Sequence, residues 1–282
     1  MRIAVLTDIH ANHTALEAVL DCIYSHSFDR IVLLGDYITD CPCPQETIKL
    51  LKAIPDRYSP VFIRGNREDY MIEYSRNPAG WCNSSKSGAL LYTYENLTAA
   101  DIGWFESMPI SARIEPEGCP PLIACHGSPE RTGYLFQTET PEAEALLESL
   151  DCGTMVCGHS HAPYVFSRGS RQIINAGALG LPKNNQTAAQ FMQLDAVGGE
   201  WKAALVSVPY DIEKAVGEFF SSGLLERSRT WGRAIIGTLR FGINYTVYCL
   251  HEAERLSAET GLPVTDEGLW EQAADNIGVP KL

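Results

Sequence analysis

The sequence contains no long apolar run, no low-complexity tract and no internal repeat. No stretch approaches the roughly 18 consecutive apolar residues that a membrane-spanning helix requires, so we expect no contact with a membrane. The apolar run at residues 1–6 is ended by Asp8 and His10, which makes it too short for the core of a signal peptide. The composition is 45% hydrophobic and 20% charged, which is typical of a globular protein with a core of ordinary size.

Basic residues are scarce relative to acidic ones. The chain carries 22 Lys and Arg against 35 Asp and Glu, which gives a formal net charge of −13. General nucleic-acid binding is therefore excluded, because that activity needs basic side chains to neutralise backbone phosphates. An anionic substrate would need bound cations to reverse the local charge where it binds.

The cysteines lack the spacing of a metal or disulfide framework. There are nine of them, an odd number, and the only close pair is Cys41 and Cys43 in a C-x-C arrangement. Several others lie inside apolar runs, where cysteine behaves as a small hydrophobic residue. We therefore expect neither a disulfide scaffold nor a thiolate zinc site, and we expect the protein to reside in a reducing cytoplasm.

The first part of the chain alternates between buried strands and helices. Residues 2–7, 30–34 and 60–64 form apolar runs, and predicted helices follow Asn12, a good N-terminal cap, and span roughly residues 44–54. This order predicts a parallel sheet with crossover helices.

The remainder of the chain adds strands and then only helices. Residues 66–108 look mostly helical, and the following segments look like strands or hairpins: 110–114, 121–125, 154–157, 163–167 with 171–174, and 188–194 with 201–207. A helix is expected at 141–149, and the second half looks more antiparallel than the first. We expect an α/β fold of two mixed sheets packed face to face with helices outside. Residues 1–207 would form this domain, and residues 208–282 a helical extension that packs on it or on a second subunit.

Metal-binding residue types follow the predicted strands in five short segments. These residues are Asp8, His10, Asp36, Asn66, His126, His159 and His161. Because open α/β sheets bind ligands at the carboxyl ends of their strands, we expect these side chains to meet there. Two divalent metals need a bridging carboxylate, and Asp36 suits that role because Gly35 lets the backbone approach closely. Asp8 and His10 are two residues apart at a strand end, so both should point to the same side.

These segments resemble the calcineurin-like metallophosphoesterase family, whose pattern is D-x-H, G-D, G-N-H-[DE], a histidine before glycine, and G-H-x-H. Residues 175–182 also look like the N-P-G-S-x-G-x-P segment of its small bacterial and archaeal branch, which includes phosphodiesterases and dinucleoside polyphosphate hydrolases. The resemblance covers about residues 1–207 and implies a four-layer α/β/β/α sandwich.

The resemblance also assigns ligands to two metals. Asp8, His10, Asp36 and His161 would hold the first metal, and Asp36, Asn66, His126 and His159 would hold the second. The mixed oxygen and nitrogen ligands suit Mn²⁺, Fe²⁺ or Fe³⁺, Zn²⁺ or Ni²⁺. A hydroxide that bridges the two metals would attack phosphorus. Asp36, Asn66, Arg67 and His126 are the candidate catalytic residues.

The departure from the family pattern is Arg67, where the family usually has the histidine that assists the leaving group. Arginine stays protonated and cannot act as a general acid, but it can clamp a phosphate oxygen. We therefore expect a preference for bonds with good leaving groups. Tyr37, next to the proposed bridge, either touches the substrate or packs in the core.

The leading functional hypothesis is a metal-dependent hydrolase of phosphodiesters or phosphoanhydrides that acts on a small phosphorylated substrate, with nucleotides among the candidates. A dinucleoside polyphosphate hydrolase is a close alternative, and a phosphoprotein phosphatase is a weaker one because Arg67 replaces the proton donor. A catalytically silent scaffold on the same fold is the alternative from another class. The helical extension could then serve as an interaction surface, and it could also mediate a homo-oligomer.

Overall fold

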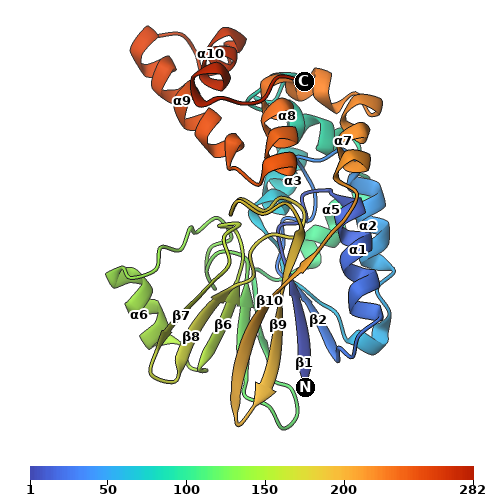
Figure 1. Cartoon of the computed structure of the whole chain (residues 1–282), viewed down its shortest axis with the longest axis vertical. Helices are drawn as coiled ribbons and strands as arrows, with labels where there is room; N and C mark the ends of the chain where they lie inside the picture. Colours follow the sequence, from blue (N-terminus) through green and yellow to red (C-terminus); the bar gives the residue numbers. More distant parts are fainter.

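The computed structural model describes all 282 residues, which form two five-stranded mixed β-sheets and ten α-helices (Figure 1). The first sheet has the order β10-β9-β1-β2-β3, with β1 (Arg2–Leu6), β2 (Arg30–Leu33), β3 (Val61–Phe62), β9 (Ala189–Val197) and β10 (Glu200–Val208). The second has the order β4-β5-β6-β8-β7, with β4 (Ser111–Ile114), β5 (Leu122–Cys125), β6 (Thr154–Cys157), β7 (Tyr164–Arg168) and β8 (Arg171–Asn175). The expected α/β fold is confirmed.

The inner strands of both sheets are apolar on both faces because each of these strands is covered on both sides. In β1, Ala4 and Leu6 pack against α1 (His13–Tyr24) and α2 (Pro44–Lys52), whereas Ile3 and Val5 face the second sheet. The outer face of the second sheet packs against α6 (Pro141–Ser149). This four-layer burial explains why the strands read as uninterrupted apolar runs rather than as alternating patterns.

The strands of the second half pair mostly antiparallel, as expected: β4 with β5, β7 with β8, and β9 with both β10 and β1. β9 returns to the first sheet and pairs antiparallel with β1, with Leu194 opposite Ile3. The second sheet keeps two parallel pairs, β5 with β6 and β6 with β8. The apolar pattern of β9 and β10 defines two strands but does not define their partner, which is a contact between distant parts of the chain.

Three helices connect the two sheets, and a short 3-10 helix (Asp56–Tyr58) precedes β3. They are α3 (Asn66–Arg76), α4 (Gly88–Glu95) and α5 (Ala99–Ser107). The side chain of Thr98 caps α5 by accepting a hydrogen bond from the backbone N–H of Asp101, whose carboxylate bonds back to Thr98. The region 66–108 is thus largely helical, as predicted.

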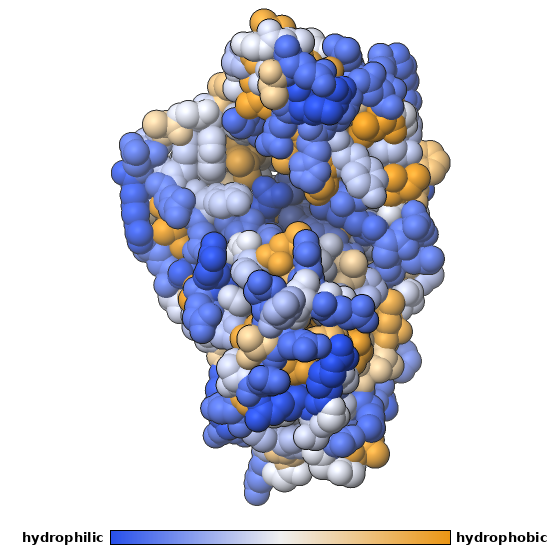
Figure 2. Space-filling model, turned by 90° about the vertical axis from the view of Figure 1, so that its left-hand side faces the viewer, coloured by the Kyte–Doolittle hydropathy of each residue, from blue (hydrophilic) through white to orange (hydrophobic).

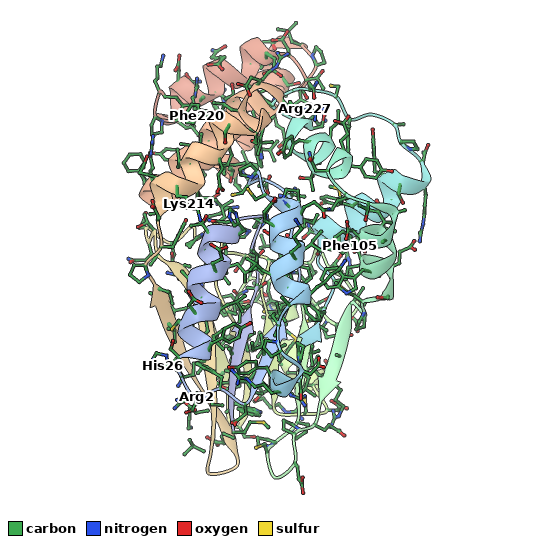
Figure 3. The ribbon with its side chains drawn as sticks, turned by 90° about the vertical axis from the view of Figure 1, so that its right-hand side faces the viewer. Arg2, His26, Phe105, Lys214, Phe220 and Arg227 are labelled. Carbon is green, nitrogen blue, oxygen red and sulfur yellow. The ribbon has the colours of Figure 1, made fainter.

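The C-terminal extension lies over the loops at the carboxyl ends of the strands (Figure 1). It consists of α7 (Ile212–Ser221), α8 (Leu224–Phe241), α9 (Tyr245–Thr260) and α10 (Glu267–Ile277). Phe219 and Leu239 share an apolar cluster with Tyr92 of α4 and Leu181. Figure 3 shows Lys214 above α1, where its Nζ lies 3.5 Å from the carboxylate of Glu17. The extension therefore packs on α1 and α4 within one chain, over the site described below.

None of the helices combines the length and the hydropathy that a membrane span requires.

Candidate metal centre

The loops that follow the strands carry the predicted ligands, and they do so in an unusual backbone conformation. Five of the ligands have positive φ angles: Asp8 at 52°, His10 at 51°, Asp36 at 53°, His159 at 66° and His161 at 56°. Such angles are uncommon outside glycine and cost free energy, and they cluster at functional sites. Asp8 and His10 do converge, but left-handed turns after β1 bring them together rather than the alternation of a strand.

Two glycines allow the loops to approach one another closely. A Cβ atom on Gly65 would lie 2.3 Å from Asp36 Oδ1, and one on Gly35 would lie 2.3 Å from the backbone nitrogen of Gly65. Gly35 also has a φ of 99°, which disfavours a side chain there. The loops that carry Asp36 and Asn66 therefore touch backbone to backbone.

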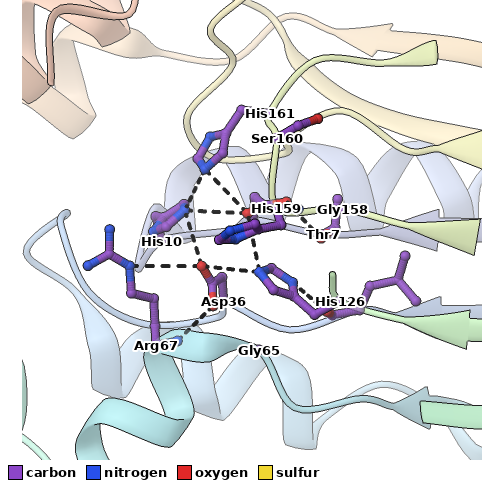
Figure 4. A network of polar contacts seen from close by, with 12 residues as sticks. Thr7, His10, Asp36, Gly65, Arg67, His126, Gly158, His159, Ser160 and His161 are labelled. Atoms are coloured by element: carbon purple, nitrogen blue, oxygen red, sulfur yellow. Dashed lines mark hydrogen bonds and ion pairs between the residues drawn. The ribbon is translucent and has the colours of Figure 1, made fainter. Parts of the chain in front are cut away.

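The first group of side chains contains Asp8, His10 and His161. Figure 4 shows the rings of His10 and His161 side by side. Nε2 of His10 lies 3.2 Å from Nε2 of His161, and Asp8 Oδ1 lies 3.3 Å from the latter nitrogen. Nδ1 of His161 donates to the Leu181 carbonyl at 2.7 Å, which fixes the ring with Nε2 directed inward. Three ligand atoms thus point at one small space.

The second group contains Asp36, His126 and His159. Asp36 Oδ2 lies 3.4 Å from Nε2 of His126 and 4.0 Å from Nε2 of His10, so this carboxylate stands between the two groups. Nδ1 of His126 donates to the Leu34 carbonyl at 2.8 Å, which again directs Nε2 inward. The position of Asp36 is the one that a bridging ligand requires.

Several buried polar atoms at this place lack any hydrogen-bond partner. They are Asp8 Oδ1, Asn66 Oδ1 and His126 Nε2. Leaving such groups buried and unpaired is costly, and native proteins seldom do so without a ligand. The oxygen and imidazole donors fit divalent transition metals, and no thiolate is among them.

Burial and the charges of neighbouring residues set the pKa values of the site residues. Burial alone would raise the pKa of Asp8, but the neighbouring His161, His10 and His126 hold it well below its usual range. Burial alone would lower the pKa of His126, but the Asp36 carboxylate raises it to about 9. Burial keeps the pKa of His161 well below its usual range, with the positive charge of Lys183 acting in the same direction. The site therefore presents anionic carboxylates beside imidazoles, as a metal site does.

Arg67 lies beside both groups at the start of α3. Its backbone N–H donates to Asp36 Oδ1 at 2.9 Å, and its guanidinium Nη2 lies 3.3 Å from Asp40 Oδ2. The side chain is 21% exposed, so it can still meet a molecule in the site.

Tyr37 does not line the site, so its assignment as a substrate-binding residue is wrong. The side chain is fully buried, and its hydroxyl donates to the carbonyls of Leu33 and Ile63 at 2.9 and 2.6 Å. Asp36 turns toward the metal groups, and the next residue consequently points the opposite way, into the core beneath α5. The packing alternative is the one that the structure supports.

Asp40 belongs to the site but was not predicted from the sequence. Its carboxylate lies 3.1 Å from Nδ1 of His10, and Nε1 of Trp231 donates to it at 2.9 Å. Burial would raise the pKa of Asp40, but the Arg67 guanidinium and these two bonds hold it far below its usual range. Asp40 therefore orients a ligand imidazole and links it to α8 of the extension.

Glu68 and Lys183 also belong to the site and were not assigned a role. The Glu68 carboxylate accepts hydrogen bonds from the backbone N–H groups of Asp36, Tyr37 and Gly65, each at 2.9 Å, and so ties the two loops together. Lys183 is half-buried and forms no ion pair, and burial lowers its pKa to about 8. The sequence signal for both was adjacency to motif residues, since Glu68 follows Arg67 and Lys183 follows Pro182.

Comparisons with known proteins agree with this geometry. Residues 1–198 match the model of the calcineurin-like phosphoesterase superfamily domain. An uncharacterized protein of Methanocaldococcus jannaschii is 26% identical over 243 residues, which cover 79% of this chain and 94% of that protein.

Two solved structures share the fold. A metallophosphoesterase from Sphaerobacter thermophilus has a TM-score of 0.67 at 24% identity and covers 86% of this chain and 100% of its own. A hypothetical protein from Pyrococcus horikoshii has a TM-score of 0.72 at 21% identity and covers 86% and 98%.

Proposed function

We propose that this chain, which belongs to the calcineurin-like phosphoesterase superfamily, hydrolyses phosphodiester or phosphoanhydride bonds in a small phosphorylated substrate. The observation that supports this proposal most strongly is the pair of facing ligand groups with Asp36 between them. The unpaired buried atoms Asp8 Oδ1, Asn66 Oδ1 and His126 Nε2 supply a reason for the arrangement, because a cation would satisfy all three.

Two divalent cations would occupy the site, from the set Mn²⁺, Fe²⁺ or Fe³⁺, Zn²⁺ and Ni²⁺. Asp8, His10 and His161 would hold one, His126, His159 and Asn66 the other, and Asp36 would touch both. When bound, such a pair supplies an acidified water as nucleophile and offsets the negative charge of the phosphate.

The residues of the chain have separate tasks in this proposal. The Arg67 guanidinium holds a non-bridging phosphate oxygen and stabilises the charge that develops there. Lys183 adds a second positive charge near Asp40 and Arg67. A bond forms between phosphorus and the oxygen of water, the bond to the leaving oxygen breaks with its electron pair, and the proton of the water passes to solvent.

Arg67 favours substrates with good leaving groups. It cannot give up a proton, so a leaving oxygen must depart as an anion, which is easier for a phosphate or an aryl oxide than for an alkoxide. Nucleotide anhydrides, including dinucleoside polyphosphates, and aryl diesters are therefore the preferred classes. A phosphoprotein phosphatase is disfavoured for the same reason, and a silent scaffold is disfavoured because every expected ligand is present.

A substrate panel tests the proposal. The purified protein, loaded with Mn²⁺, is assayed on alkyl and aryl monoesters, cyclic and aryl diesters and nucleotide anhydrides. We expect turnover of aryl diesters and anhydrides to exceed that of alkyl monoesters. Hydrolysis of none of them would overturn the proposal, and a preference for alkyl monoesters would overturn the role of Arg67.

A variant pair on one helix isolates Arg67. Arg67→Ala should lower kcat by roughly 10²-fold while the bound metal content stays unchanged. Arg76→Ala, also on α3 but 67% exposed, is the matched control and should behave like the wild type.

We place the protein in the cytoplasm, because all nine of its cysteines are unpaired thiols.

A further inference from the structure

A cavity of about 290 Å³ lies between the metal centre and the C-terminal extension. Its floor includes Asn66, Arg67 and His159, and its roof includes Trp231, Leu250 and Trp270, from α8, α9 and α10. Figure 2 shows the surface hollowed between the C-terminal helices above and the sheets below. The extension therefore forms one wall of the space above the ligands.

The roof is aromatic and rigid. The rings of Trp231 and Trp270 meet edge to face with their centroids 6.1 Å apart, and Nε1 of Trp231 is fixed by its hydrogen bond to Asp40. Leu90 and Tyr70 extend the apolar lining. Aromatic and aliphatic walls of this kind suit a planar apolar group.

The cavity also carries an unneutralised positive charge. Lys86 lines it, is exposed, and makes no ion pair and no hydrogen bond. The one acidic residue of the lining, Asp40, is already engaged by His10, Arg67 and Trp231. The Lys86 ammonium therefore leaves a positive charge at the cavity that an anionic group of a ligand can meet.

A second cavity of about 470 Å³ lies next to the first, and Tyr70 and Leu90 line both. Tyr74 and Trp81 line it with their rings stacked at 4.0 Å. The two cavities together have the size of an ordinary small-molecule site. They offer room for a group larger than a single ring.

The side from which phosphorus would be attacked determines where the leaving group lies, and it points to this cavity. The ligand side chains lie beneath the cavity, and Asp8, His10, Asp36 and His126 are each at most 2% exposed. Attack on phosphorus from that side makes an in-line leaving oxygen depart toward the opposite side, which is the roof formed by the extension.

We propose that this cavity binds the leaving group of the substrate, and that this group is planar, aromatic and itself negatively charged, as a nucleoside phosphate is. The inference rests on the proposed hydrolase function. It assigns Lys86 the recognition of the charge, and Trp231 and Leu250 the contact with the flat ring. The extension is then a specificity element of this chain.

Lys86 provides the test, because it is exposed and bonded to nothing, so its loss leaves the fold unaffected. Values of kcat/KM are measured with Mn²⁺ for diadenosine tetraphosphate and for bis(p-nitrophenyl) phosphate, whose leaving group has no second charge. Lys86→Ala should lower the ratio of the first value to the second roughly tenfold, the effect of one charge-assisted contact. Lys49→Ala, which removes another exposed and unpaired lysine on α2, should leave the ratio unchanged.

A second variant tests the cavity volume. Leu250→Trp narrows the space and should raise KM for diadenosine tetraphosphate at least several times more than KM for bis(p-nitrophenyl) phosphate.

The outcomes separate the two proposals. If the wild type cleaves neither substrate nor any other member of the panel, the hydrolase function fails. If it cleaves the aryl diester, but Lys86→Ala leaves the ratio of kcat/KM values unchanged and Leu250→Trp changes the two KM values alike, the hydrolase stands and the leaving-group cavity is overturned.

Discussion

The metal cradle, by which we mean the loops that carry the seven candidate ligands, and the C-terminal extension are in contact. They differ in backbone conformation and in how completely their polar groups are hydrogen-bonded. Five ligands of the cradle have left-handed backbone angles, whereas the extension has one such non-glycine residue, Arg229. The cradle leaves Asp8 Oδ1 and His126 Nε2 buried and unpaired. In the extension, Asp211, Asn244 and Asp266 cap their helices with their own side chains. The cradle thus gives up stability for ligand binding, and the extension provides a regular and well-capped structure above it.

The two regions are joined by a short polar chain. Trp231 of the extension donates to Asp40, and Asp40 holds both His10 and Arg67. A change in the extension can therefore reach a ligand of the cradle without any large movement. This connection explains how a region without a readable motif can influence the site.

Removal of the Asp36 carboxylate should have the largest effect on the cradle. Asp36→Asn withdraws the charge that lies between the two groups, so we expect kcat for an aryl diester to fall by about 10³-fold or more and one or both metals to be lost. Steady-state kinetics and elemental analysis measure both effects. Asp56→Asn, the same change at an exposed position, provides the control. A fully active Asp36→Asn protein would show that Asp36 takes no part in the mechanism.

One Gly→Ala substitution in each region compares how tightly the two regions are packed. Gly65→Ala would place a Cβ 2.4 Å from the backbone nitrogen of Asp36 and should lower the free energy of unfolding by about 3 kcal/mol. Gly217→Ala on α7 meets nothing within 4 Å and should raise it by about 0.5–1 kcal/mol. Urea denaturation of both variants measures the difference. Equal effects would contradict the view that the cradle is the tightly constrained region.

Substitutions that weaken the polar contact between the two regions should have an intermediate effect on metal affinity. Asp40→Asn weakens the hold on His10, so we expect metal affinity to fall by roughly 10–100-fold. Trp231→Phe keeps the ring and removes a single N–H donor, so its effect should be smaller and in the same direction. Metal titration by calorimetry compares the two variants. A Trp231→Phe protein that binds metal like the wild type would show that the extension does not act through Asp40.

Metal binding should also depend on pH. The Asp36 carboxylate outweighs burial and raises the pKa of His126 to about 9, so this ring must lose a proton before it can bind a metal at neutral pH. Metal affinity should therefore rise by about tenfold for each pH unit between 7 and 8.5. The metal-free protein should show the opposite trend. A raised folded-state pKa contributes stability that is complete below the ordinary value of 6.5 and is lost toward 9.

Competition with a metal indicator at several pH values, together with urea unfolding of the metal-free protein, measures both trends. A metal affinity that does not change with pH would show that metal binding does not displace a proton from His126.

The strands and the positions of the seven candidate ligands at the strand ends were predictable because their signals are local. An apolar run followed by Asp8, Asp36 or His126 defines both a buried strand and a polar residue at its end. The helix after Asn12 was predictable for the same reason, since its cap lies three residues before the N–H that it binds.

The features that the sequence did not predict depend on contacts between residues far apart in the chain. Asp40 reaches His10 and Trp231 across 30 and 191 positions of the chain, and no spacing rule links them. Tyr37 could not be assigned because either face of the loop was open to it until α5 was placed. The partner sheet of β9 was undetermined for the same kind of reason.

Anomalous diffraction from crystals grown with Mn²⁺ tests the central claim most directly. We predict two peaks about 3.5–4 Å apart, with Asp36 between them and with Asp8, His10 and His161 around one and Asn66, His126 and His159 around the other. Crystals that show no peak, or a single peak, among these side chains at saturating Mn²⁺ would contradict the binuclear centre.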